Sequence, residues 1–204
     1  MARPAPPTRL TDRKRAAIVD AAVAEFRAAG FETTSMDRIA ATAGVSKRTV
    51  YNHFPSKEAL FVHIVDALMA RGSDERATPY RAGTPLRGQL LELVQRKLRL
   101  LHEPDFADLA RVAIVASLHS PELARQLMEL LGRREHAMTT WVRAAAADGR
   151  LRTEDPAFAA QQLESLVKGA AFWPQIAMGQ APLTDAQQDA VAESAVEMFL
   201  ARYG

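Results

Sequence analysis

The chain has 204 residues and a formal net charge of +2, and 48% of its residues are hydrophobic and 25% charged. This composition is typical of a soluble globular protein with one core, or of a small domain joined to a larger one. The sequence has no apolar run that could span a bilayer and no secretory signal segment, so we expect a cytoplasmic protein with no membrane partner. The absence of cysteine excludes disulfides, thiolate nucleophiles and cysteine-type zinc sites.

The charge is unevenly distributed along the chain. Residues 1–57 contain ten Lys and Arg against five Asp and Glu, a net of +5, whereas residues 58–204 contain sixteen against nineteen, a net of −3. A basic front end on a slightly acidic remainder indicates that an anionic partner binds at the front. Taken alone, the asymmetry is explained equally well as a chance excess of solvated charges.

Helical periodicity dominates the first third of the chain. After an arm at residues 1–10 that we expect to be disordered, apolar spacings of three and four residues predict helices over 11–29, 35–43, 46–54 and 56–71. Gly30, Gly44 and Pro55 supply the stops of the first three helices, and Thr34 or Ser35 can cap the second. The polar stretch 72–85 is typical of a loop between domains.

The remainder of the chain continues the helical pattern. We predict helices over 86–103, 105–118, 121–148, 155–178 and 184–202, with Pro174 kinking or shortening the fourth of them. No segment shows the alternation of a strand. The expected fold is therefore all-α with about nine helices, divided into a domain at 11–71 and a larger domain at 72–204.

Residues 34–54 have the pattern of a helix-turn-helix. Two short helices flank a tight turn containing Gly44, and Ile39 and Ala40 of the first can pack against Val45 and Val50 of the second. The small side chain of Ala40 lets the two helices cross closely. In such a unit the second helix is presented to the DNA major groove.

A helical wheel of residues 46–54 separates an inner and an outer face. At about 100° per residue, Val50 and Phe54 share the apolar face. The other side chains can read base edges or bond phosphates. The outward face holds Arg48, Thr49, Tyr51 and Asn52, and Lys47 and His53 lie nearer its edges.

Three cations are predicted at the positive ends of helices. Lys47 and Arg48 lie in the first turn of one helix, and Lys57 lies in the first turn of the next. A cation is less favourable there than an anion because helix N-termini carry a positive partial charge. Phosphates of an external partner would offset the unfavourable placement of all three cations. The alternative is that the three are separately solvated surface cations.

The stretches 30–40 (GFETTSMDRIA) and 44–61 (GVSKRTVYNHFPSKEALF) resemble the DNA-binding domain of the TetR family over about residues 11–71. Val50 stands where Leu or Ile is commoner in that family. The resemblance implies a three-helix DNA-binding head whose fourth helix leads to a ligand-binding body. It implies base contacts by Lys47, Arg48 and Tyr51, and phosphate contacts by Ser35, Thr49, His53 and Lys57. Thr34 and Asn52 complete the predicted contact set.

The C-terminal half resembles the AefR-like or AcrR-like branch of the family. The residues that carry this likeness are 120–125, 147–151, 155–156, 169–174 and 199–204. The resemblance implies a homodimer formed through the last two helices, and therefore a palindromic operator in double-stranded DNA. Gly169, Ala170 and Ala171 permit close helix approach, although intrachain core packing would use the same residues.

Apolar and aromatic side chains with a few polar groups predict an effector pocket in the same half. The candidates are Phe106, His136, Thr140, Trp141, Gln162, Phe172 and Trp173, for which ordinary core packing is the alternative. The predicted function is a sequence-specific transcriptional repressor released by a small hydrophobic or aromatic effector.

We predict no catalytic residue, metal or cofactor. The five histidines form no His-Glu-x-x-His motif, and there is neither a phosphate-binding glycine loop nor a nucleophile elbow. Two alternatives remain open at this point. One is an enzyme with an accessory DNA-binding head, and the other is a helical binding module that contacts no DNA.

Overall fold

The computed structural model describes residues 10–72, 79–133 and 137–204, and every regular element within them is a helix. The all-α prediction is confirmed. The chain divides into two compact units, which comprise residues 1–67 with 112–130 and residues 68–111 with 131–204. The expected disordered arm, residues 1–10, lies outside the described residues except for Leu10, the first residue of α1.

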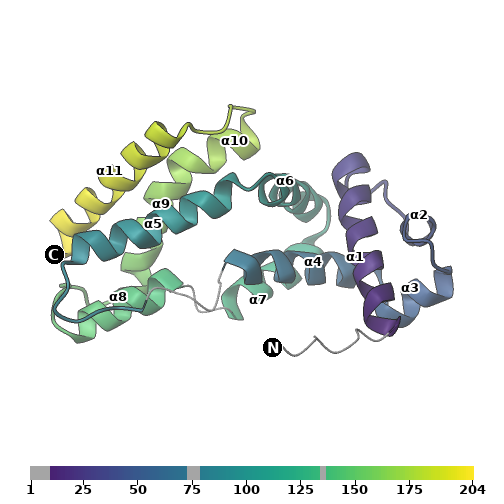
Figure 1. Ribbon diagram of the computed structural model, residues 1–204, viewed down its shortest axis with the longest axis horizontal. Helices are drawn as coiled ribbons and strands as arrows, with labels where there is room; N and C mark the ends of the chain where they lie inside the picture. Colours follow the sequence, from purple (N-terminus) through teal and green to yellow (C-terminus); the bar gives the residue numbers. More distant parts are fainter. Residues whose placement is uncertain (1–9, 73–78, 134–136) are drawn as a thin grey trace, which may run out of the picture. The chain divides into compact units, whose positions relative to one another are not determined.

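The first unit contains the four N-terminal helices at the predicted places (Figure 1). These are α1 (Leu10–Ala29), α2 (Met36–Thr42), α3 (Lys47–His53) and α4 (Lys57–Gly72), the last of which extends into the second unit. The unit also takes in the C-terminal half of α6 (Pro104–His119) and most of α7 (Pro121–Arg133). Short-range signals, namely glycine stops and serine caps, set the ends of α1, α2 and α3.

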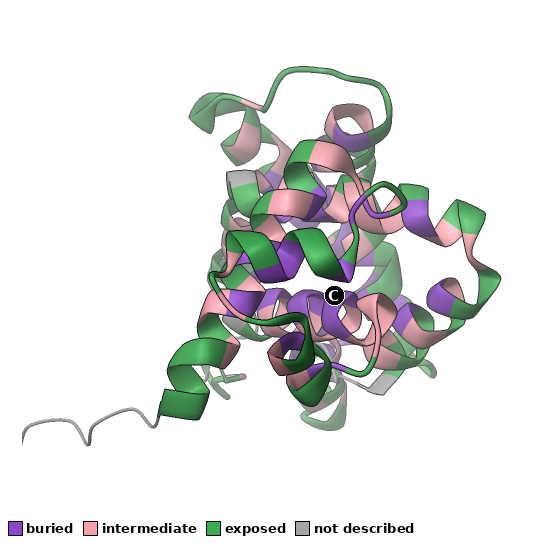
Figure 2. Cartoon of the chain, turned by 90° about the vertical axis from the view of Figure 1, so that its right-hand side faces the viewer, coloured by how far each residue is buried: buried purple, intermediate pink, exposed green. Residues whose placement is uncertain are grey.

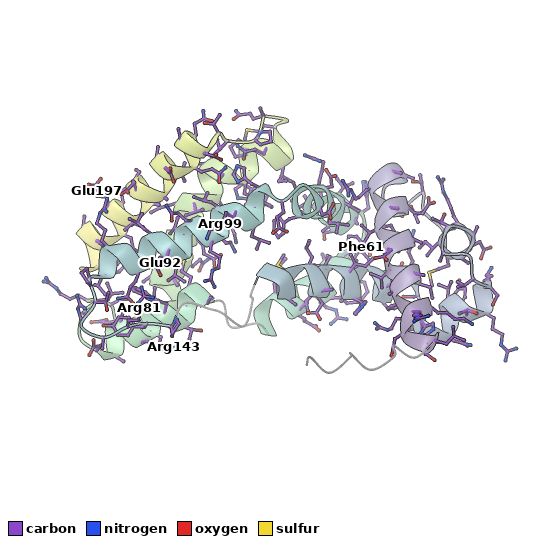
Figure 3. All side chains as sticks on the ribbon, in the orientation of Figure 1. Phe61, Arg81, Glu92, Arg99, Arg143 and Glu197 are labelled. Carbon is purple, nitrogen blue, oxygen red and sulfur yellow. The ribbon has the colours of Figure 1, made fainter. Side chains whose placement is uncertain are left out.

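Three aromatic rings form the centre of the first unit. The rings of Phe26, Phe31 and Phe61 are 5.2 to 5.5 Å apart from one another, centroid to centroid, and all three side chains are buried. Phe61 points inward from α4 in Figure 3. Edge-to-face and offset contacts of this kind are favourable beyond the area they bury. The cluster therefore packs α1 and the loop that follows it against α4.

The second unit is a layered helical body. It contains α5 (Leu86–His102), the first half of α6, α8 (Ala137–Ala147), α9 (Pro156–Ala171), α10 (Trp173–Ala177) and α11 (Asp185–Tyr203). In Figure 1, α11 runs beside α5 and α9, and α8 packs against α9. Buried residues occupy one side of each helix and exposed residues the other (Figure 2).

Two predicted helices differ from the observed ones. The helix expected over 155–178 is interrupted at Phe172, whose φ and ψ of −132° and −63° end α9 before α10 begins. Pro174 lies in the first turn of α10, where its missing N–H costs no helical hydrogen bond. The helix expected over 121–148 is observed as α7 and α8, on either side of residues 134–136, which lie outside the described residues.

Buried Gln89 joins the loop before α5 to the core of the second unit. Its Oε1 accepts a hydrogen bond from the Arg81 backbone N–H at 2.7 Å, and its Nε2 donates to the carbonyls of Arg81 and Thr84. The Arg81 guanidinium in turn lies 3.1 Å from the carboxylate of Glu92 on α5 (Figure 3). A buried amide with these partners satisfies backbone groups that the loop would otherwise leave unpaired.

Candidate DNA-binding surface

The turn between α2 and α3 has the geometry that a helix-turn-helix requires. Gly44 has a φ of +64°, a conformation in which a side chain would be strained, and the Val45 N–H donates to the Ala40 carbonyl at 3.0 Å. The hydroxyl oxygen of Ser35 caps α2, and that of Ser46 caps α3. The start of α3 is therefore fixed by hydrogen bonds local to the sequence.

The orientation of α3 agrees with the helical wheel. Val50 and Phe54 are buried, which confirms the predicted inner face. The exposed side chains of α3 are Lys47, Arg48, Tyr51 and Asn52, with Tyr51 44% exposed, whereas Thr49 and His53 are half-buried. One side of this short helix therefore presents two cations, a phenol and an amide to solvent.

The two cations of α3 differ in their surroundings. The Lys47 ammonium forms an ion pair at 2.8 Å with Asp37 of α2, and the hydrogen bond to that carboxylate raises the pKa of Lys47. Arg48 makes no hydrogen bond or ion pair with the described part of the chain. Its guanidinium is thus available for a bidentate contact.

The residues before α2 take different roles. Ser35 is exposed, and its hydroxyl oxygen accepts a hydrogen bond from the Arg38 N–H at 3.2 Å. Thr34 is only 2% exposed, and its hydroxyl donates to the Gly30 carbonyl at 2.7 Å. The structure therefore gives Thr34 a role in closing the loop after α1 and leaves its side chain no surface for DNA.

Lys57, at the start of α4, is bound to the same loop. Its ammonium donates to the Phe31 carbonyl at 2.7 Å and lies 4.3 Å from the centre of the Phe31 ring. A second contact reaches the Glu32 carbonyl at 3.3 Å. Lys57 therefore joins α4 to the loop after α1, in addition to any contact that its remaining N–H makes outside the protein.

One cation of this unit, Arg15, is absent from the contact residues predicted from the sequence. The Arg15 guanidinium contacts the His63 ring nitrogen at 3.0 Å and lies 4.7 Å from the centre of the Phe54 ring. The available signal was its position on α1, because Arg15 precedes Ile18, Ala22 and Phe26 on one helical stripe, and those three are buried. A cation on a core-facing stripe indicates a partner from another element.

The candidate pocket residues of the second unit do not form one group. Phe106 and Phe172 contact each other with ring centres 6.4 Å apart, and half-exposed Trp173 adjoins Phe172 at 5.0 Å. Trp141 is buried elsewhere, where its indole N–H contacts Gln89 Oε1 at 3.4 Å.

The other three candidates have different positions. Gln162 is exposed on α9, where its side-chain oxygen accepts a hydrogen bond from the Tyr203 hydroxyl. Thr140 is exposed on α8, and His136 lies outside the described residues. Of the six predicted residues that the structure describes, Phe106, Phe172 and Trp173 are therefore brought together.

An apolar face runs along α9 and α11. A groove of about 580 Å³ is lined by residues of both helices, among them Phe158, Leu166 and Met198. These three side chains are 53%, 37% and 51% exposed. A second groove of about 280 Å³ continues past Ala170, Val191 and Ala195. Large apolar side chains exposed together in this way mark an interaction surface.

The described residues contain neither a candidate metal site nor a candidate membrane span. No group of three or more His, Asp or Glu side chains is placed to hold a metal ion there. None of the helices in the described ranges is both long and apolar enough to cross a membrane.

Family profiles match both parts of the chain. Residues 18–64 match the profile of bacterial regulatory proteins of the tetR family, and residues 88–204 match that of the AefR-like transcriptional repressor C-terminal domain. The curated relatives include the HTH-type transcriptional regulator RutR of Escherichia coli strain K12. It is 30% identical over 156 residues, which cover 73% of this chain and 69% of RutR.

Solved structures share the fold. A TetR family transcriptional regulator from Pseudomonas syringae pv. tomato strain DC3000 is 51% identical, with a TM-score of 0.83 over 95% of this chain and 98% of that one. The flavonoid-responsive regulator FrrA is 30% identical, with a TM-score of 0.78 over 94% of this chain and 97% of that one. The match extends over both units of the chain.

Proposed function

The chain belongs to the TetR family of DNA-binding transcriptional regulators, with an AefR-like C-terminal domain, and from this premise we propose that it is a dimeric repressor released from its operator by a small hydrophobic or aromatic effector. The DNA-binding domain would comprise residues 11–71, and the effector-binding and dimerisation domain residues 72–204. Such a repressor acts in the cytoplasm, where bacterial DNA lies.

The outward face of α3 carries this proposal. Arg48 and Asn52 can each form bidentate contacts with base edges, and Lys47 and Tyr51 flank them on the exposed surface. Groups that can bond DNA phosphates lie at the margins of this face. They are the hydroxyl groups of Ser35 and Thr49, the His53 ring and the remaining N–H of Lys57. Thr34 is left out of this contact set because its side chain is buried.

The partner that we propose for the α9–α11 face is a second copy of the chain. A single seven-residue recognition helix buries little surface, whereas a two-fold dimer reads two half-sites and gains affinity from both. Phe158, Leu166 and Met198 would then be buried by the same face of the partner, in a self-complementary interface.

We place the effector beside the aromatic cluster of Phe106, Phe172 and Trp173 in the second unit. Apolar and aromatic walls suit a hydrophobic or aromatic molecule. The relative FrrA, which is described as flavonoid-responsive, responds to an aromatic compound of this kind. Binding would shift α4 and so change the separation of the two recognition helices, which must lie about 34–36 Å apart to enter successive major grooves.

The proposal is tested by recovering the DNA that the protein selects. Purified full-length protein is mixed with fragments of its own genome, and bound fragments are sequenced and aligned for a shared palindrome. We expect binding to the selected fragment to weaken steeply as salt rises, because each neutralised phosphate releases counterions. Recovery of no fragment above background, or a constant affinity across the salt series, would contradict the proposal.

A further inference from the structure

Three charged side chains lie together where α5 contacts α9 in the second unit, namely Lys97 of α5 and Glu164 and Lys168 of α9. The Lys97 ammonium is 3.8 Å from Oε2 of Glu164, and the same oxygen is 2.9 Å from the Lys168 ammonium. The Lys97 and Glu164 side chains are 22% and 13% exposed. Two cations thus share one carboxylate, and the three side chains together carry an excess positive charge. Lys168 is 36% exposed, whereas Lys97 and Glu164 are largely shielded from water.

Lys97 occupies a core position of α5. Leu90, Val94 and Leu101 are buried, and Lys97 falls between Val94 and Leu101 on the same stripe, at spacings of three and four residues. A methionine or leucine would be the ordinary residue at such a position. A lysine there carries the cost of removing its ammonium from water, so a specific partner is expected.

The described part of the chain supplies that partner only incompletely. The 3.8 Å separation from Glu164 exceeds hydrogen-bonding distance, and Glu164 is in closer contact with Lys168. Burial lowers the pKa of Lys97, the charge of Glu164 opposes that shift, and the charge of Lys168 adds to it. An ammonium has three N–H donors, so Lys97 has donor capacity for a further acceptor.

On α9, the aromatic cluster begins one helical turn after Lys168. Leu101 lies one turn after Lys97 on α5, and Phe172 ends the helix one turn after Lys168, with its backbone N–H donating to the Lys168 carbonyl at 3.1 Å. The Phe172 ring contacts that of Phe106. An elongated ligand could therefore place an apolar body against the rings and one end near the ammonium groups.

We propose that the effector site takes an amphipathic organic anion, whose carboxylate, sulfonate or phenolate oxygens accept hydrogen bonds from Lys97 while its aromatic part packs on Phe106 and Phe172. This proposal rests on the proposed function in that it assigns the chemical class of the effector. An anion here balances the excess positive charge of the cluster and supplies the acceptor that Glu164 does not.

The test uses two fluorescent probes that share one aromatic skeleton. The first is 8-anilinonaphthalene-1-sulfonate, an anion, and the second is N-phenyl-1-naphthylamine, which lacks the sulfonate and is neutral. Each is titrated into the full-length protein, and the dissociation constants are compared among the wild type, Lys97→Met and Lys97→Arg. Lys14→Met, which removes an exposed lysine of α1, is the matched control for loss of one positive charge.

We expect Lys97→Met to weaken binding of the anionic probe about tenfold or more, because a charge-assisted hydrogen bond is lost. Binding of the neutral probe should change little, Lys97→Arg should retain most of the anion affinity, and Lys14→Met should match the wild type. Thermal unfolding checks that Lys97→Met is folded, which we expect because replacing a buried charge with an apolar side chain is often neutral or stabilising.

Two outcomes would overturn the assignment. In one, Lys97→Met leaves the affinity for the anionic probe unchanged. In the other, both probes lose affinity equally, so that the variant alters packing and not charge recognition. Neither result depends on DNA, so failure of the proposed function is seen separately, as absence of binding by the wild-type protein to any genomic fragment.

Discussion

The Nη1 atom of Arg15 lies 3.0 Å from Nε2 of His63, which connects α1 to α4 next to the C-cap of the recognition helix. The rings of His63 and Phe54 are 5.4 Å apart, and the Arg15 guanidinium lies over the Phe54 ring. Phe54 is the C-cap residue of α3. Since a guanidinium can only donate, Nε2 of His63 accepts this hydrogen bond and the imidazole is neutral in the pair.

This pair predicts that the first unit loses stability in mild acid. Burial lowers the pKa of His63, the nearby Arg15 charge lowers it further, and Asp66 opposes the shift. The unfolded chain then binds a proton near pH 6.5, and the folded chain does so only at lower pH. The free energy of unfolding should therefore decrease as the pH falls below about 6.5, and the His63 contribution should level off below the folded-state pKa.

Denaturant unfolding of the wild type and His63→Gln, each measured near neutral pH and near pH 5, checks this prediction. Glutamine can still accept a hydrogen bond from Arg15 but does not titrate. The wild type should lose more unfolding free energy over this interval than the variant does. Equal losses in the two proteins would show that the stability at acid pH is governed by other groups.

The ion pair between Lys47 and Asp37 predicts an effect on DNA binding rather than on folding. Both side chains are more than half exposed, and exposed ion pairs contribute little to stability. Asp37→Asn removes an anion from the proposed DNA surface and releases the Lys47 ammonium for phosphate. The variant should bind the selected fragment more tightly, with a steeper salt dependence and an unchanged melting temperature. Weaker binding would mean that Asp37 positions Lys47 for its contact.

Arg48 provides a test of base recognition. Arg48→Ala should reduce discrimination between the selected palindrome and unrelated DNA, since a bidentate arginine contact is worth about 1–3 kcal/mol against the wrong base. Arg48 is exposed and has no partner in the described part of the chain, so the variant should unfold at the wild-type temperature. Competition binding with both DNAs measures the ratio of the affinity for the palindrome to the affinity for unrelated DNA. An unchanged ratio would show that other residues read the sequence.

The elements of the N-terminal part could be predicted from the sequence because their determinants are local. Gly30 and Gly44 adopt the positive φ angles at which glycine ends a helix, and Ser35 and Ser46 cap the helices that follow. The inner face of α3, with Val50 and Phe54, followed from its period alone. The burial of Thr34 could not be predicted from the helical period, because the acceptors of its hydroxyl are the carbonyls of Glu25 and Gly30 in the preceding segment.

The interior of the C-terminal part was less accessible to such reasoning. Residue type alone predicts aromatic and polar side chains as pocket candidates, but Gln162 lies on the face of α9 that adjoins Tyr203 of α11. Trp141 is held by Gln89, 52 positions earlier in the chain. A helical wheel shows that Lys97 lies on a core-facing stripe, yet its neighbour Glu164 comes from a different helix. Contacts between residues this far apart in the sequence depend on how the helices pack, and local sequence patterns do not specify that packing.

The apolar face of α9 and α11 gives the last prediction, that a charge placed on it separates the proposed dimer. Leu166→Glu would bring like charges from two chains together in a self-complementary interface, at a cost of several kcal/mol. The variant should sediment as a monomer at concentrations where the wild type is a dimer, and it should lose affinity for the palindrome. Met128→Glu, at an exposed apolar residue of α7, is the control and should remain dimeric. A dimeric Leu166→Glu protein would place the interface on another surface of the molecule.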